Sequence, residues 1–121
     1  MKAFTDIEQS RKLAEILPVE SADAFYDMAE PVKRQVPIIG HPDEYYDMED
    51  WAIPSWSLAA LFKLLPKSIE GAEPSLIKTF RDDYRIVYDI YGDENITSED
   101  YTNPIDACYE MIIRLKEKDL L

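Results

Sequence analysis

NPIDACYEMIIRLKEKDLL (Asn103–Leu121) carries the clearest secondary-structure signal in the chain. Asn103 can cap a helix, Pro104 suits the first helical position, and Asp106 lies where the helix dipole favours an anion. The pattern predicts an amphipathic helix whose last turn carries the basic residues. Its expected buried stripe consists of Ile105, Cys108, Met111, Ile112 and Leu115.

Upstream of this helix the hydrophobic period changes from that of a helix to the two-residue repeat of a strand. Every second residue from Tyr84 to Ile90 is aromatic or β-branched, which is typical of a β-strand. An earlier strand over Leu76–Phe80 would pair with it across a turn at Asp82-Asp83. The sequence therefore predicts a β-hairpin within residues 75–91.

A second helix is predicted within Ile53–Ile69, IPSWSLAALFKLLPKSI. Pro54 and Ser55 supply a helix start, and Pro66 ends the run. The apolar residues between these prolines recur at spacings of three and four, which indicates a mostly buried helix. They are Leu58, Leu61, Phe62 and Leu65.

A third helix is predicted near the start of the chain. Thr5 and Glu8 have the spacing of a capping box, and Pro18 disfavours helical geometry before it, so the helix should end near Leu17. A short helical turn is expected over residues 21–28. The proline-rich stretch 31–54 should be largely irregular, with an edge strand over 36–39.

These elements predict an α+β fold in which about three helices pack on a small antiparallel sheet that contains the hairpin near residues 75–91. A lone hairpin is too weak to stand in water, so helices must cover one of its faces. A length of 121 residues fits a single globular domain, residues 1–121.

Composition limits the classes of partner. The chain is 46% hydrophobic and 31% charged, with a formal net charge of -12. This charge disfavours direct contact with nucleic acid or an anionic membrane, so a charged partner should be basic. The single cysteine excludes an internal disulfide, and there is neither a signal-like start nor an apolar run of about 18 residues. We therefore expect a cytoplasmic protein.

Residues suited to catalysis are scarce. His41 lies in an expected loop, whereas Cys108 lies in the buried stripe, so a Cys/His pair is not expected. The alternating oxygen donors Asp93, Asn95, Thr97 and Glu99 resemble a calcium loop, but Pro104 occupies the position of the final glutamate. We therefore predict no catalytic residue, no metal site and no cofactor, which makes an enzyme the less favoured class.

Acidic and aromatic residues are interleaved in the stretch from His41 to Trp56. Such a segment can hold a partner rich in arginine or lysine through ion pairs and cation–π contacts. In the alternative interpretation, Trp51 and Trp56 pack onto the buried helix while the acids face water. The candidate interface residues are Asp43, Glu44, Tyr45, Tyr46, Asp47, Glu49, Asp50 and Trp51.

Three blocks, Thr5–Pro18, Ile53–Pro66 and Asn103–Leu115, resemble a group of small uncharacterised acidic proteins encoded in gut-bacterial genomes, often in prophages or integrated mobile elements. The resemblance covers roughly a third of the chain. It implies a mobile-element setting and assigns no functional residue.

Three classes of function follow from these observations. The favoured hypothesis is a noncatalytic accessory domain that binds another protein, because catalytic groups are scarce and the acidic-aromatic segment is present. One alternative is an acidic DNA mimic that inhibits a DNA-binding protein. The other is a carboxylate-based enzyme or small-ligand binder, which would need a closed pocket lined by two or more carboxylates with raised pKa values.

Overall fold

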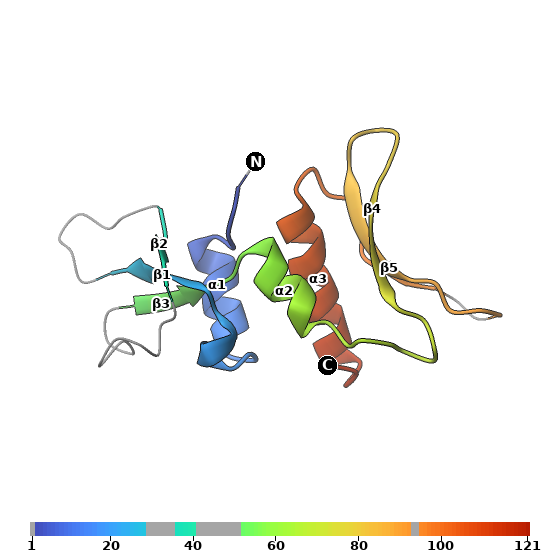
Figure 1. Cartoon of the computed structure of the whole chain (residues 1–121), viewed down its shortest axis with the longest axis horizontal. Helices are drawn as coiled ribbons and strands as arrows, with labels where there is room; N and C mark the ends of the chain where they lie inside the picture. Colours follow the sequence, from blue (N-terminus) through green and yellow to red (C-terminus); the bar gives the residue numbers. More distant parts are fainter. Residues whose placement is uncertain (1, 29–35, 41–51, 93–94) are drawn as a thin grey trace. The chain divides into compact units, whose positions relative to one another are not determined.

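The computed structural model describes residues 2–28, 36–40, 52–92 and 95–121 (Figure 1). These residues form two antiparallel three-stranded sheets with strand orders β2-β1-β3 and β4-β5-β6, together with three α-helices. The α+β class and the number of helices are confirmed; the second sheet was not expected. In chain order the elements are α1 (Ile7–Ala14), a 3₁₀ helix (Val19–Ser21), β1 (Ala24–Asp27), β2 (Ile38–Ile39), β3 (Ala52–Ser55), α2 (Leu58–Leu64), β4 (Pro74–Lys78), β5 (Tyr84–Tyr88), β6 (Ile96–Thr97) and α3 (Pro104–Glu117).

The described chain divides into two compact units, residues 2–60 and 61–121, with the boundary inside α2. The expectation of a single domain stays a prediction. In the first unit α1 packs against β3, and in the second α3 packs against β5. Each sheet is thus covered by one helix, as the weakness of isolated hairpins requires. None of the helices in the described ranges is both long and apolar enough to cross a bilayer.

The first unit corrects two expectations about secondary structure. Residues 24–27, expected in a helical turn, form the central strand β1, and Pro54 and Ser55, expected at a helix start, belong to β3. Proline is tolerated there because β3 is an edge strand. The helix α2 begins at Leu58 instead, where Ser57 Oγ accepts a hydrogen bond from Ala60 N–H at 3.2 Å.

The capping box of α1 exists, but one residue later than predicted. Asp6 accepts a hydrogen bond from Gln9 N–H at 2.8 Å, and the Gln9 side chain accepts one from Asp6 N–H at 3.1 Å. Thr5 is buried and contributes to a different network, described below. The helix itself ends at Ala14, with Leu17 buried just beyond it.

In the second unit the predicted helix α3 and the presence of the β-hairpin are confirmed. Asn103 Oδ1 accepts a hydrogen bond from Ile105 N–H at 2.8 Å, and Pro104 opens α3. Every residue of the predicted apolar stripe of α3 is buried. The hairpin pairs β4 with β5, although its first strand covers Pro74–Lys78 rather than Leu76–Phe80. Asp82 takes a left-handed backbone conformation, with a φ of 63°, in the turn between the strands.

Candidate interaction surface

The strand β4 is an edge strand with exposed apolar side chains on both of its faces. Leu76 is 37% exposed and Ile77 is 41% exposed. Because consecutive residues of a strand point to opposite faces, these two side chains lie on different sides of the sheet. Natural edge strands usually carry charges, prolines or bulges that prevent pairing with another chain. Here Pro74 and Lys78 are at the ends of the strand, and its centre is apolar.

Among the described residues, the backbone of β4 has groups without a hydrogen-bond partner at every second position. On β5, Tyr84 exchanges two hydrogen bonds with Tyr101, and Ile86 C=O accepts one from Ser98 N–H, so these β5 residues point away from β4. The intervening β5 residues therefore point toward β4 and pair with Ser75 and Ile77. Consequently, the backbone groups of Pro74, Leu76 and Lys78 point outward. We call the strand Pro74–Lys78 together with Phe80 the β4 edge.

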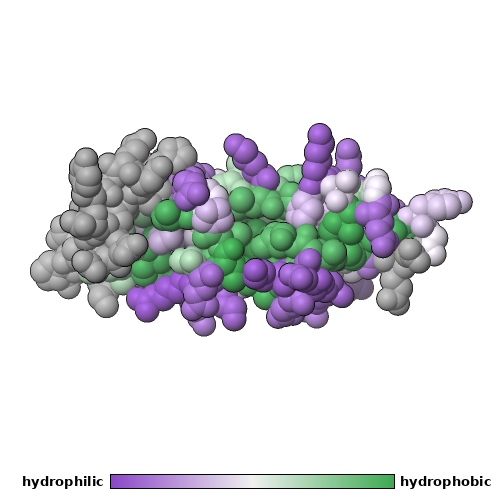
Figure 2. Space-filling view, turned by 90° about the horizontal axis from the view of Figure 1, so that it is seen from below, coloured by the Kyte–Doolittle hydropathy of each residue, from purple (hydrophilic) through white to green (hydrophobic). Residues whose placement is uncertain are grey.

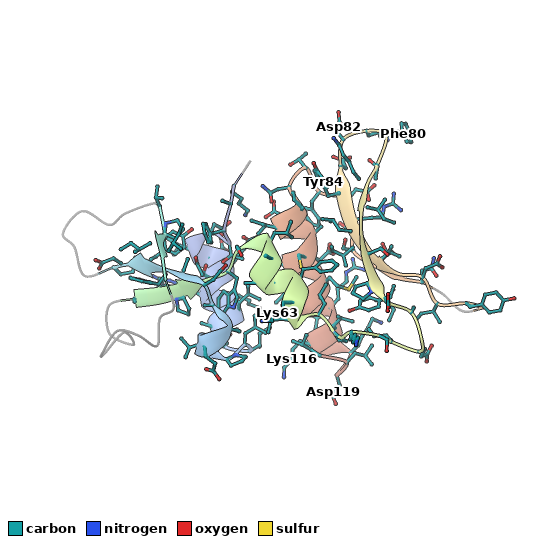
Figure 3. The ribbon with its side chains drawn as sticks, viewed as in Figure 1. Lys63, Phe80, Asp82, Tyr84, Lys116 and Asp119 are labelled. Carbon is teal, nitrogen blue, oxygen red and sulfur yellow. The ribbon has the colours of Figure 1, made fainter. Side chains whose placement is uncertain are left out.

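The tip of the hairpin extends this apolar surface. Phe80 is 93% exposed, and the Arg81 guanidinium carbon lies 5.6 Å from the centre of its ring. Figure 3 places Phe80 and Asp82 at the tip of the β4–β5 hairpin. Lys78 Nζ lies 3.4 Å from Asp82 Oδ1, but both side chains are mostly exposed, so this ion pair adds little stability.

The strand β5, which pairs with β4, is fixed by buried side chains and by a hydrogen bond. Ile86 and Tyr88 are fully buried, and Tyr88 Oη donates a hydrogen bond to the Pro66 carbonyl at 2.7 Å. Burial, with a smaller contribution from Cys108, raises the pKa of Tyr88 to about 12, so the hydroxyl stays a donor at neutral pH. On the face of the sheet opposite to Ile86 and Tyr88, Arg85 Nε lies 2.9 Å from Asp100 Oδ1. The β4 edge therefore pairs with a strand whose position is fixed by the core of this unit.

A polar network ties the opposite edge strand, β6, to α3. The Arg114 guanidinium lies 2.7 Å from Glu110 Oε1 and donates a hydrogen bond to the Thr97 carbonyl at 3.0 Å. Glu110 also accepts from Glu99 N–H at 3.0 Å. Burial and a hydrogen bond to Glu110 raise the pKa of Tyr101, which keeps that hydroxyl protonated. From the sequence, Arg114 was expected only as one of the basic residues of the last helical turn, and this structural role was missed.

A shallow hollow of about 630 Å³ lies beside β6 and the end of α3. Its walls are mainly apolar, and Glu70 is the one carboxylate among its lining residues. The enzyme hypothesis asked for at least two carboxylates in one pocket, so this hollow does not support it. The lining residues are Pro66, Ser68, Ile69, Glu70, Ile90, Ile96 and Leu120.

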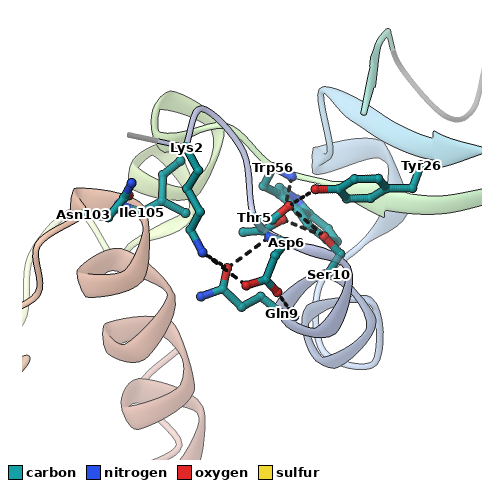
Figure 4. Close-up of polar contacts among 9 residues, drawn as sticks. All are labelled: Lys2, Thr5, Asp6, Gln9, Ser10, Tyr26, Trp56, Asn103 and Ile105. Carbon is teal, nitrogen blue, oxygen red and sulfur yellow. Dashed lines mark hydrogen bonds and ion pairs between the residues drawn. The ribbon is translucent and has the colours of Figure 1, made fainter. Parts of the chain in front are cut away.

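The first unit contains a buried hydroxyl network (Figure 4). Thr5 Oγ1 lies 2.7 Å from Ser10 Oγ, and Tyr26 Oη donates to the Thr5 carbonyl at 2.7 Å. Thr5 N–H donates to the Trp56 carbonyl at 2.9 Å, and Trp56 N–H donates to Thr5 Oγ1 at 3.2 Å. Each hydroxyl bonds within the network, and no imidazole or carboxylate activates any of them in these bonds. The arrangement joins α1 to β1 and β3 and has a structural role.

The candidate residues from the sequence fall into two groups. His41 and the interface candidates Asp43, Glu44, Tyr45, Tyr46, Asp47, Glu49, Asp50 and Trp51 lie outside the described residues, so their role stays a prediction. Trp56 is fully buried and donates a hydrogen bond from Nε1 to Ser21 Oγ at 3.0 Å, which suits core packing. Cys108 is also buried, and burial raises the pKa of its thiol to about 12. No cluster of metal-binding side chains occurs within the described ranges.

Comparison with known proteins adds no assignment. No protein-family model, curated protein or solved structure was found to match the chain. The functional argument therefore depends on the geometry of the second unit. Hydrophobic residues reach the molecular surface on the face shown in Figure 2, between projecting hydrophilic residues.

Proposed function

We propose that this chain is a noncatalytic accessory domain that binds another protein, and that the β4 edge is its docking site. The observation that carries this proposal is the exposure of Leu76 and Ile77 at the centre of an edge strand whose outward backbone groups have no partner in the described part of the chain. An extended segment that lies along such an edge gains main-chain hydrogen bonds and covers the exposed apolar side chains.

Physical arguments favour the binding of a partner strand at β4 over an edge that stays uncovered. Burying the remaining exposed parts of Leu76, Ile77 and Phe80 would contribute free energy at roughly 25 cal/mol per Å² of apolar surface. The underlying strand β5 is already fixed by buried side chains and by the Tyr88–Pro66 hydrogen bond. Because the site is preorganised, little of this free energy is lost in ordering the domain itself.

The mobile-element setting implied by the sequence resemblance forms part of the proposal, since accessory proteins that act by binding suit that setting. The acidic-aromatic residues 43–51 remain a candidate second contact. Both statements rest on the sequence and are tested by finding the partner.

A partner search with matched variants tests the proposal. Tagged wild-type protein, Ile77→Asp and Tyr91→Asp are used to capture proteins from a lysate of the source cells, with capture measured by quantitative mass spectrometry. Both substitutions add one negative charge to the same unit, and Tyr91 is fully exposed and lies outside the β4 edge. Circular dichroism first establishes that both variants are folded.

A protein captured by wild type and Tyr91→Asp, but depleted at least about tenfold with Ile77→Asp, supports the β4 edge as the docking site; that depletion equals about 1.4 kcal/mol of binding free energy. Equal capture by all three proteins, or no specific capture, contradicts it.

A further inference from the structure

We infer that the partner presents an extended strand that alternates apolar and basic residues, and that this strand adds directly to β4. This inference depends on the proposed function and names the chemistry of the partner. The proposed occupant of the β4 edge is a segment of a different protein rather than a second copy of this chain.

The outward backbone groups define what the partner must supply. Leu76 and Lys78 each present one N–H and one C=O, because the inward positions Ser75 and Ile77 pair with β5. Pro74 presents only its carbonyl, since proline has no N–H. The partner strand therefore bonds most fully along 76–78, and its pairing weakens toward Pro74.

The side chains define an alternating pattern in the partner. Leu76 lies opposite Ile86 and shares its face, which is the face of the buried residue Tyr88 as well. Partner side chains on this face would extend the apolar core and should be apolar. Ile77 lies on the other face, opposite Arg85 and beside the solvent-exposed Arg85–Asp100 ion pair. Partner side chains near Ile77 on that face meet water and can be charged, whereas Val87, farther along the same face, is buried.

Electrostatics selects basic over acidic residues at those charged positions. The chain carries a net charge of -12, which attracts a basic segment and repels an acidic one at long range. Near the edge itself the charges are mixed: Glu73, Asp82 and Asp83 are acidic, whereas Lys78, Arg81 and Arg85 are basic. The preference for a basic partner therefore rests on the net charge of the chain. A second copy would bring another net charge of -12 to the same edge, and the two copies would repel each other at low salt. A basic segment is attracted under the same conditions.

Three synthetic peptides of about seven residues, the length of a typical strand, test this inference by fluorescence anisotropy. The first alternates valine and lysine, the second alternates valine and glutamate, and the third is the lysine peptide with its central valine replaced by proline. The third peptide keeps the positive charge but loses a central N–H. Binding is measured with wild-type protein, Lys78→Pro and Lys78→Gln, at low and at high salt.

The two Lys78 variants separate the backbone from the charge. Both remove the ammonium group, but only Lys78→Pro removes the outward N–H. We expect the lysine peptide to bind wild type at least about tenfold more tightly than either other peptide, and Lys78→Pro to bind it at least about tenfold more weakly than Lys78→Gln does. High salt should weaken binding because it screens the attraction.

Equal binding of the three peptides, or equal affinity of the two Lys78 variants, overturns the inference. A salt-promoted dimer in sedimentation analysis that Lys78→Pro abolishes also overturns it, in favour of a second copy. If Ile77→Asp loses a cellular partner while the lysine peptide shows no preference, the proposed function stands and only the partner's chemistry is wrong. If Ile77→Asp retains every partner, the proposed function itself fails.

Discussion

Proline substitution along β4 should affect stability in alternation, because the backbone N–H groups of this strand point alternately toward and away from β5. Ile77→Pro removes a ladder hydrogen bond worth about 1 kcal/mol and leaves a β5 carbonyl unpaired, which costs about 1–3 kcal/mol more. Lys78→Pro removes an N–H that has no partner in the sheet, and it breaks an exposed ion pair worth below about 1 kcal/mol. We expect losses of about 2–4 kcal/mol for Ile77→Pro and below about 1 kcal/mol for Lys78→Pro.

Thermal melting followed by circular dichroism can distinguish these losses. At roughly 4 °C per kcal/mol for a domain of this size, Ile77→Pro should lower the Tm by about 8–16 °C and Lys78→Pro by less than about 4 °C. Ser75→Pro, which also faces β5, should resemble Ile77→Pro. If Lys78→Pro were as destabilising as Ile77→Pro, the assignment of outward groups would be wrong, and strand addition at β4 would lose its geometric basis.

Three further predictions concern the core. Tyr26→Phe should lower stability by about 1 kcal/mol in urea unfolding, because it removes the buried hydrogen bond to the Thr5 carbonyl, whereas Tyr91→Phe should change nothing. Ile112→Asp, which buries a charge in the α3 stripe, should abolish cooperative melting; a retained transition would contradict the core assignment. Stability should fall as pH rises from about 9 toward about 12, because the pKa of the Cys108 thiol is raised to about 12 in the fold and the unfolded chain loses that proton first. Cys108→Ala should reduce this dependence most clearly between about pH 9 and pH 10, because the raised pKa of Tyr88 adds a similar loss at higher pH.

The elements predicted correctly from the sequence are those whose signals are local. The helix α3 has its cap, its first-turn proline and its apolar stripe within one continuous segment, and all three are found in the structure. The hairpin of β4 and β5 is also local, since its strands are joined by a short turn. Hydrophobic periodicity and capping chemistry are sufficient in such cases because the interacting groups are close in sequence.

The incorrect predictions concern segments whose secondary structure depends on residues far away in the sequence. Ala24 pairs with Ser55, so β1 and β3 are stabilised by residues about thirty positions apart in the sequence. In addition, a strand of four residues is too short to show a clear two-residue hydrophobic repeat. Pro54 is compatible with both a helix start and an edge strand. Similarly, Thr5 and Asp6 can both cap a helix, and the buried hydrogen bonds between Thr5 and Trp56 favour Asp6 as the cap.

The β4 edge could not be predicted, because apolar residues in a strand normally indicate core. Only the strand order shows that Leu76 and Ile77 lie at an edge and stay partly exposed. An exposed apolar edge would ordinarily promote association between copies of a chain. A net charge of -12 opposes that association at long range, while it attracts basic segments. The exposed apolar edge and the negative net charge together favour a basic partner strand over a second copy of this chain. A basic strand would form backbone hydrogen bonds with β4, whereas repulsion between two copies hinders them from forming the same bonds.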